Sequence, residues 1–115
     1  MEQTKNHIDY VEFKAADLAA IKKFYSSVFG WNFTDYGPTY IAFDNSGLTG
    51  GFELCEDPVV NGTLIVLYHD DLEKCMSKIK ENGGIISRSI FSFPGGKRFH
   101  FNDPSGNELA VWSEK

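Results

Sequence analysis

The 115-residue sequence lacks any apolar run long enough to span a membrane, and its first ten residues contain no apolar segment of the kind that a secretory signal requires. It has only two cysteines, Cys55 and Cys75, whose spacing indicates neither a zinc site nor a disulfide framework. Basic residues are also scarce, because 11 Lys and Arg stand against 16 Asp and Glu, a formal net charge of −5. We therefore expect a cytoplasmic protein with reduced thiols that binds neither nucleic acid nor a membrane.

Aromatic residues, by contrast, are abundant, since the chain has 10 Phe, 5 Tyr and 2 Trp. They suffice to fill the core of one small domain and still line a cavity. Of the two cysteines, we expect Cys75 in that core and Cys55 on a strand.

The first half of the chain is typical of one helix among short strands. Residues 8–13 alternate apolar and polar side chains, which predicts a half-buried strand. Asp17 is suited to begin a helix and Gly30 to end it. The apolar stripe of this helix would be Leu18, Ile21, Phe24, Tyr25, Val28 and Phe29. Further strands are predicted over 31–36, 39–43 and 49–55.

The second half repeats this order. A strand is predicted over 63–69, followed by a helix that Asp70 or Asp71 caps and that Gly83 and Gly84 end. The apolar stripe of this helix would be Leu72, Cys75, Met76 and Ile79. Three strands are predicted to follow, over 85–93, 97–102 and 107–113.

Landmarks of the two halves share one offset of 54 residues: Asp17 and Asp71, Leu18 and Leu72, Gly30 and Gly84. We therefore predict an α+β fold of two tandem β-α-β-β-β modules, over residues 6–56 and 62–114 of a single domain. Each module would form a curved mixed sheet with its helix on the convex face. The concave faces would form a cleft, which is a natural site for a small molecule.

Two motifs within this repeat are specific. Residues 24–31 read FYSSVFGW at the end of the first helix, and residues 98–108 read RFHFNDPSGNE across the last hairpin. In these motifs the sequence resembles the vicinal oxygen chelate superfamily, which includes glyoxalase I, bleomycin-resistance proteins and extradiol dioxygenases. It is most similar to the single-domain glyoxalase-like branch related to lactoylglutathione lyase. The resemblance covers nearly the whole chain and implies the glyoxalase/bleomycin-resistance fold and a homodimer.

The resemblance also implies where a metal ion would lie, since the metal enzymes of the superfamily use four ligands, mostly His and Glu, from four strands. In this sequence the matching positions carry Tyr10, Gly51, Leu64 and Ala110. Gly51 is placed by an offset of 59, which implies five extra residues near 93–96. A phenol is a poor ligand, and the neighbouring Glu53 alone is insufficient. We therefore predict no metal and no cofactor.

The same four positions predict which residues line the cleft, because alternate residues of a strand share one face. The predicted cavity residues are Tyr10, Glu12, Leu64, Val66, Tyr68, Glu108, Ala110 and Trp112. If Glu12 is desolvated in the cavity, we expect it to transfer a proton or to hold a cationic ligand. If it lies at the wet rim or pairs with a Lys or Arg, it would do neither. Tyr10 and Trp112 either pack against neighbours or form a platform for a ligand.

Among the three histidines, His100 is the candidate for chemistry, because it lies within a dense aromatic strand. It is either an acid or base in the cavity or a hydrogen-bonded packing residue, and strand alternation does not decide which face it occupies. His7 and His69 are expected at the surface. The segment 94–96, Pro-Gly-Gly, is expected to form a mobile turn over the mouth of the cleft.

Three functions follow from these observations. We predict first that the protein binds a small, partly apolar molecule in a metal-free cavity. The second hypothesis is an isomerase or lyase similar to lactoylglutathione lyase, which moves a proton with Glu12, Tyr10 or His100. The third is a structural or partner-binding dimer whose cleft is filled by its own side chains.

Overall fold

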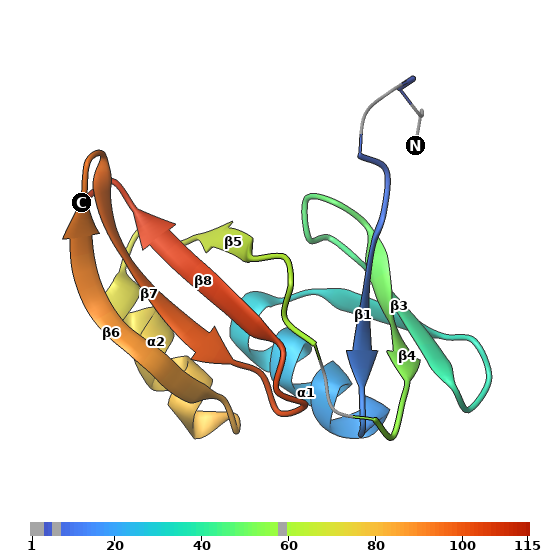
Figure 1. Cartoon of the computed structure of the whole chain (residues 1–115). Coiled ribbons are helices and arrows are strands. Elements are labelled where there is room, and N and C mark those ends of the chain that lie inside the picture. The colour runs from blue at the N-terminus through green and yellow to red at the C-terminus, as the bar shows by residue number, and fades with distance from the viewer. Residues whose placement is uncertain (1–3, 6–7, 58–59) are drawn as a thin grey trace.

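The chain folds into two β-α-β-β-β units, which follow one another in the sequence (Figure 1). The computed structural model describes residues 4–5, 8–57 and 60–115, so His7 lies outside the described residues. The first unit consists of β1 (Val11–Ala15), α1 (Leu18–Phe29), β2 (Asn32–Asp35), β3 (Tyr40–Asp44) and β4 (Gly50–Leu54). The second consists of β5 (Ile65–Tyr68), α2 (Leu72–Glu81), β6 (Ile85–Phe93), β7 (Gly96–Asn102) and β8 (Glu108–Ser113).

Each unit forms a four-stranded mixed sheet of the same topology, in the order β1-β4-β3-β2 and β5-β8-β7-β6. In both sheets the first strand runs parallel to the last, and the other neighbours are antiparallel. The predicted α+β fold with a repeated unit is therefore confirmed.

The strand register confirms the offsets that relate the two units. Glu12 pairs with Gly51 in the first sheet, and Val66 pairs with Ala110 in the second. The first strands are thus related by 54 residues and the last strands by 59. The additional residues lie in the β6–β7 hairpin, since β6 has 9 residues and β2 has only 4.

Both helices begin at an aspartate that satisfies a free amide of the first turn. Asp17 Oδ1 accepts a hydrogen bond from the Ala20 amide at 3.1 Å, and Asp71 Oδ1 accepts one from the Lys74 amide at 3.1 Å. Asp71 is therefore the cap of α2 rather than Asp70. Gly30 ends α1 in the left-handed conformation, with a φ of 73°.

The core lies between the helices and one face of each sheet. Helix α1 contacts the sheets of both units. The Tyr25 ring lies 5.3 Å from the Phe52 ring of the first sheet, and the Phe24 ring lies 6.0 Å from Phe101 of the second, measured between centroids. All four side chains are fully buried. Cys75 belongs to this core as predicted, and burial raises the pKa of its thiol to about 11.

The loop 103–107 of the conspicuous last hairpin joins the two units. Asp103 Oδ1 accepts hydrogen bonds from the Ser105 and Asn107 amides at 2.8 and 3.0 Å, which closes the loop. Asp103 Oδ2 accepts one from the Tyr25 hydroxyl of α1 at 2.9 Å. Asn107 Nδ2 donates to the carbonyl oxygen of Lys14 on β1 at 2.8 Å. The motif therefore holds the second unit against the first.

Two local expectations need correction. The first strand begins at Val11 rather than at residue 8, and Cys55 follows β4 instead of lying on a strand. The segment 94–96 forms the expected turn, which joins β6 to β7. Gly96 lies against the Ser113 carbonyl so closely that a Cβ atom there would collide with it, which fixes the turn to the end of β8.

No helix within the described residues is both long enough and apolar enough to span a membrane.

Candidate functional site

Each sheet turns one face to the helices and the other away from them, and we call the second the open face. On β1 the half-buried Val11 and Phe13 contact the core, so Glu12 lies on the open face. On β7 the fully buried Phe99 and Phe101 contact the core, which places His100 on the open face of the second sheet. The structure thereby settles the face of His100.

A pair of tyrosines occupies the open face of the first sheet. The hydroxyl oxygens of Tyr10 and Tyr40 lie 2.5 Å apart, and the Tyr40 hydroxyl is also hydrogen-bonded to Glu12. Burial, followed by these hydrogen bonds, raises the pKa of Tyr40 above its ordinary value. Tyr40 is therefore held as a neutral phenol.

Glu12 itself is exposed, so the desolvation expected for a catalytic carboxylate is not present in the single chain. It is also not the partner of the nearby lysine, because Lys14 forms an ion pair with Glu53 on β4.

The open face of the second sheet carries a histidine held by a carboxylate. His100 Nδ1 lies 3.3 Å from Glu108 Oε2, and Ser87 Oγ donates to the same oxygen at 3.3 Å. The carboxylate favours the imidazole form with its proton on Nδ1. The opposite nitrogen, Nε2, is buried and has no hydrogen-bond partner among the described residues.

Two arginines and several aromatic rings surround this histidine. The Arg88 guanidinium lies 3.7 Å above the Phe91 ring, and the Arg98 guanidinium lies 5.3 Å from the same ring. The Phe91 ring is in turn 5.8 Å from the His100 ring. Farther along the same face, Tyr68 and Trp112 meet edge to face at 5.3 Å.

A hollow of about 410 Å³ lies where β1 of the first sheet approaches the starts of β5 and β8. Acidic residues line it from both units, Glu12 from β1 and Glu108 from β8. Its apolar wall is formed by Val11, Phe13, Val60 and Ile65. Asn61 supports one side, because its side chain bonds both the Gly106 carbonyl and the Glu108 amide.

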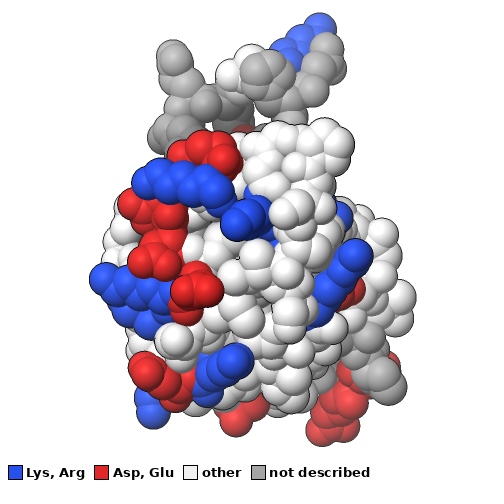
Figure 2. Space-filling model, turned by 90° about the vertical axis from the view of Figure 1, so that its left-hand side faces the viewer, with Lys and Arg blue, Asp and Glu red and all other residues white. Residues whose placement is uncertain are grey.

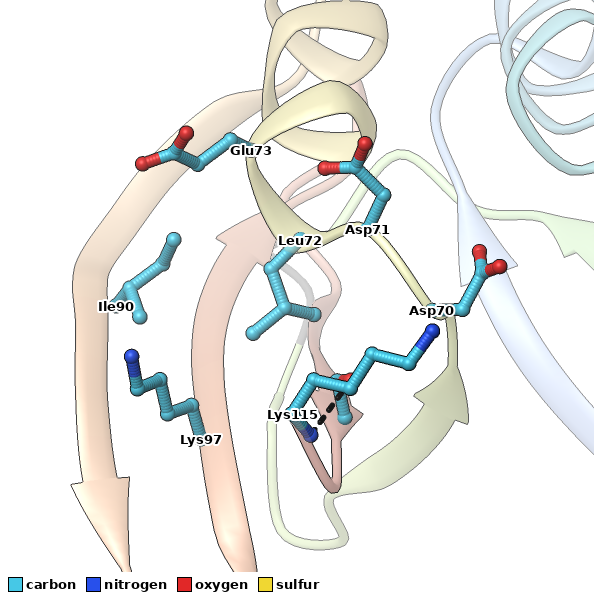
Figure 3. A pocket seen from close by; sticks show the side chains of 8 residues that line it. Asp70, Asp71, Leu72, Glu73, Ile90, Lys97 and Lys115 are labelled. Carbon is cyan, nitrogen blue, oxygen red and sulfur yellow. Dashed lines mark hydrogen bonds between the residues drawn. The ribbon is translucent and has the colours of Figure 1, made fainter.

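A second hollow, of about 400 Å³, lies at the start of α2 (Figure 3). Asp70, Asp71 and Glu73 line it together with Lys97 and Lys115. The hollow is on the helix side of the second sheet, because Lys97 alternates with the open-face residue Arg98. It is thus separate from the predicted cavity.

Figure 2 views the molecule from the side of β6. Acidic and basic side chains alternate over one half of this view, as expected for the polar surface of α2, whose exposed residues include Glu73, Lys74, Lys78 and Glu81. The other half is mainly uncharged, with isolated basic groups and acidic groups at its lower edge.

Of the eight predicted cavity residues, Glu12 and Glu108 line one hollow together. The others lie elsewhere on the open faces or at their margins, and their role in a cavity stays a prediction: Tyr10, Leu64, Val66, Tyr68, Ala110 and Trp112. The sequence reasoning missed Tyr40 and Arg88, because only the strand register brings them beside Tyr10 and His100. Arg98 had a usable signal, since it alternates with His100 on one strand.

Comparison with known proteins places this arrangement in a family. A family model described as the Glyoxalase/Bleomycin resistance protein/Dioxygenase superfamily matches residues 7–111. The chain belongs to this superfamily. Among curated proteins it is similar to CFP32 of Mycobacterium bovis, whose name marks it as a candidate glyoxylase, with 26% identity over 118 residues. That match takes up 90% of this chain but 44% of CFP32, so the chain spans less than half of that relative.

Solved structures of superfamily proteins share the fold at low sequence identity. A glyoxalase-related enzyme from Fulvimarina pelagi matches with a TM-score of 0.81 and 18% identity, covering 94% of this chain and 88% of that one. The fosfomycin resistance protein FosX from Listeria monocytogenes matches with a TM-score of 0.80 and 13% identity, covering 96% and 94%. Lactoylglutathione lyase from Agrobacterium tumefaciens matches with a TM-score of 0.72 and 18% identity, covering 96% of both chains.

The residues at the positions where the superfamily resemblance implies metal ligands do not fit an ion. Gly51, Leu64 and Ala110 offer no side-chain donor, which leaves Tyr10 alone. The space beside Gly51 is occupied, because a Cβ atom there would lie 2.6 Å from the Tyr10 hydroxyl and closer still to the Tyr40 hydroxyl. Across the parts of the chain that the structure describes, no three His, Cys, Asp or Glu side chains are grouped to hold a metal.

Proposed function

We propose that this superfamily member binds a small, partly apolar molecule in the hollow between its two units, without a metal ion. The observation that carries the proposal is the hollow of about 410 Å³, which lies at the junction of the units and combines an apolar wall with the carboxylates of Glu12 and Glu108. Its volume is within the range of small-molecule sites. The superfamily positions that would supply metal ligands carry residues without suitable donor atoms.

The proposal is tested by titration with N-phenyl-1-naphthylamine, a neutral apolar dye whose fluorescence rises on leaving water. The variant Gly62→Trp would fill the hollow, since Gly62 lines it and a Cβ atom there meets nothing within 4 Å. We expect this variant to weaken dye binding at least about tenfold, because the indole would take the place of the dye. Equal binding to Gly62→Trp and the unmodified protein would contradict the proposal.

Ser27→Trp is the matched control, because Ser27 is exposed on α1 and does not line the hollow. It adds the same indole to the surface, so it should leave the affinity for the dye unchanged. A loss of affinity in both variants would show that the dye binds elsewhere or that tryptophan interferes with the signal.

A second function is favoured by one observation, the unpartnered Nε2 of a histidine that Glu108 orients. This arrangement is suited to a general base. The corresponding hypothesis is an isomerase or lyase acting on a hemithioacetal of methylglyoxal and glutathione. Turnover that survives treatment with a chelator and is lost in His100→Gln would support catalysis.

A further inference from the structure

Two polar atoms on the open face of the second sheet are buried without partners. They are Arg98 Nε and His100 Nε2, the buried side-chain nitrogen or oxygen atoms within the described residues that lack a hydrogen bond. A buried polar atom of this kind is destabilising when it is left unpaired. The two atoms belong to residues that are two positions apart on one strand. They therefore point to a single bound group that would accept a hydrogen bond from each.

The surroundings of these atoms favour a negatively charged group. Arg88 and Arg98 flank the Phe91 ring, and neither arginine has a carboxylate partner within the described ranges. The nearby carboxylate, Glu108, is already bonded to His100 Nδ1 and Ser87 Oγ. The strand register thus places Arg88 of β6 and Arg98 of β7 on the same face as His100, whose carboxylate partner, Glu108 of β8, is already hydrogen-bonded.

We propose that Arg98 and His100 form an oxyanion-binding subsite, which takes the carboxylate or phosphate group of a small molecule with an apolar body. Arg98 Nε always carries a proton that it can donate. His100 Nε2 donates once the imidazole is protonated, and the cation then lies between the Glu108 carboxylate and the bound anion. One oxyanion accepts both hydrogen bonds.

The apolar part of such a ligand has a place on the same face. Arg98 pairs with Trp112 in the strand register, and its guanidinium lies 5.7 Å from the Phe93 ring. Trp112 extends this surface to Tyr68, which is 52% exposed. The subsite accounts for the charged part of the ligand. That the ligand also has an apolar part rests on the proposed function.

The test is a titration of the full chain, labelled with ¹⁵N-histidine, followed by NMR of the imidazole nitrogens. Benzoate and phenyl phosphate supply the oxyanion with a ring, benzamide is the neutral counterpart, and inorganic phosphate supplies the anion alone. We expect benzoate, but not benzamide, to shift His100 Nε2 to the protonated range. Tighter binding of phenyl phosphate than of inorganic phosphate would identify an organic ligand, and equal binding would identify a free anion.

Variants locate the bound anion. Arg98→Gln and His100→Gln should each weaken benzoate binding about tenfold or more, the usual effect of losing a charge-assisted hydrogen bond. Lys97→Gln is the matched control, because Lys97 is exposed on the opposite face of the same strand. Equal weakening in Lys97→Gln, or equal binding of benzamide and benzoate, would overturn the subsite.

The two proposals can fail separately. If Gly62→Trp loses dye binding and the protein binds no anion, the proposed function is supported and the oxyanion subsite is ruled out. Anion binding that depends on Arg98, with dye binding insensitive to Gly62→Trp, would do the reverse.

Discussion

Gly51 shows at the scale of single residues how this chain departs from its metal-binding relatives. The residue occupies a position where the superfamily resemblance implies a ligand, and the Tyr10 and Tyr40 hydroxyls occupy the space that a side chain would need. The tyrosine pair can therefore occupy this space only because residue 51 has no side chain. A side chain at this position would have to displace at least one of the two phenols.

We predict that Gly51→Ala lowers the free energy of unfolding by about 1–3 kcal/mol, because the added methyl group overpacks against two hydroxyls. Tyr40→Phe, which removes the hydroxyl that lies closer, should cost less in the Gly51→Ala background than alone. Urea denaturation of the four proteins in this double-mutant cycle measures the coupling. Gly62→Ala is the control, since nothing lies within 4 Å of the added atom, and equal destabilisation by the two glycine variants would contradict the account.

Asp103 is a second residue whose environment affects the stability of the whole fold. Burial raises the pKa of this carboxyl, although four hydrogen bonds to it act in the opposite direction. The folded state therefore holds the proton more tightly than the unfolded chain does. The stabilisation that this tighter proton binding gives to the folded state is fully present below the ordinary carboxyl pKa of about 4. It is lost as the pH rises through the raised pKa of Asp103.

Asp103→Asn cannot titrate, so the stability of the unmodified protein relative to this variant should fall as the pH rises through that window. At neutral pH the variant should still be less stable by about 2–3 kcal/mol, because the amide nitrogen that replaces Oδ2 cannot accept the hydrogen bonds from the Tyr25 hydroxyl and Asn107 Nδ2. Urea denaturation across the pH range gives both quantities. A stability difference that increases with pH would contradict the raised pKa.

At the scale of helices and strands, the aspartate caps and the alternation of strand residues could be read from the sequence. The apolar stripes and caps predicted both helices, and the 54-residue offset predicted that the β-α-β-β-β unit is repeated. Alternation alone could not place His100, since it separates two sets of residues without saying which set contacts the helices. The Tyr10–Tyr40 pair was also beyond reach, because it depends on how β1, β4 and β3 are registered against one another.

The caps give a prediction at this scale. Asp17→Ala and Asp71→Ala should each lower the free energy of unfolding by about 1 kcal/mol, because each leaves an amide of the first helical turn without its side-chain acceptor. Thermal unfolding followed by circular dichroism measures the loss. Asp57→Ala is an exposed control outside both helices and should change stability by less than about 0.5 kcal/mol.

At the scale of the whole molecule, the open faces expose large apolar side chains. Tyr10 and Val66 are each 44% exposed and Tyr68 is 52% exposed, although all three are large and mainly apolar. The loop 103–107 joins the two units through Asp103 and Asn107, whereas the open faces remain uncovered. We propose that a second copy of the chain covers them.

Light scattering during size-exclusion chromatography should therefore give twice the chain mass of 12.9 kDa. Val66→Asp should shift the population toward the single chain, because it adds a charge to the surface that the partner would bury. Ser27→Asp, on the exposed side of α1, should not. A mass of one chain at all concentrations would rule out the dimer.

The central claim is that the protein retains the superfamily fold but binds its ligand without a metal. Titration with N-phenyl-1-naphthylamine in the presence of EDTA, and again with an excess of Zn²⁺ or Ni²⁺, tests it most directly. The account predicts the same dissociation constant in both conditions. Binding that disappears in EDTA and returns with the metal would contradict it.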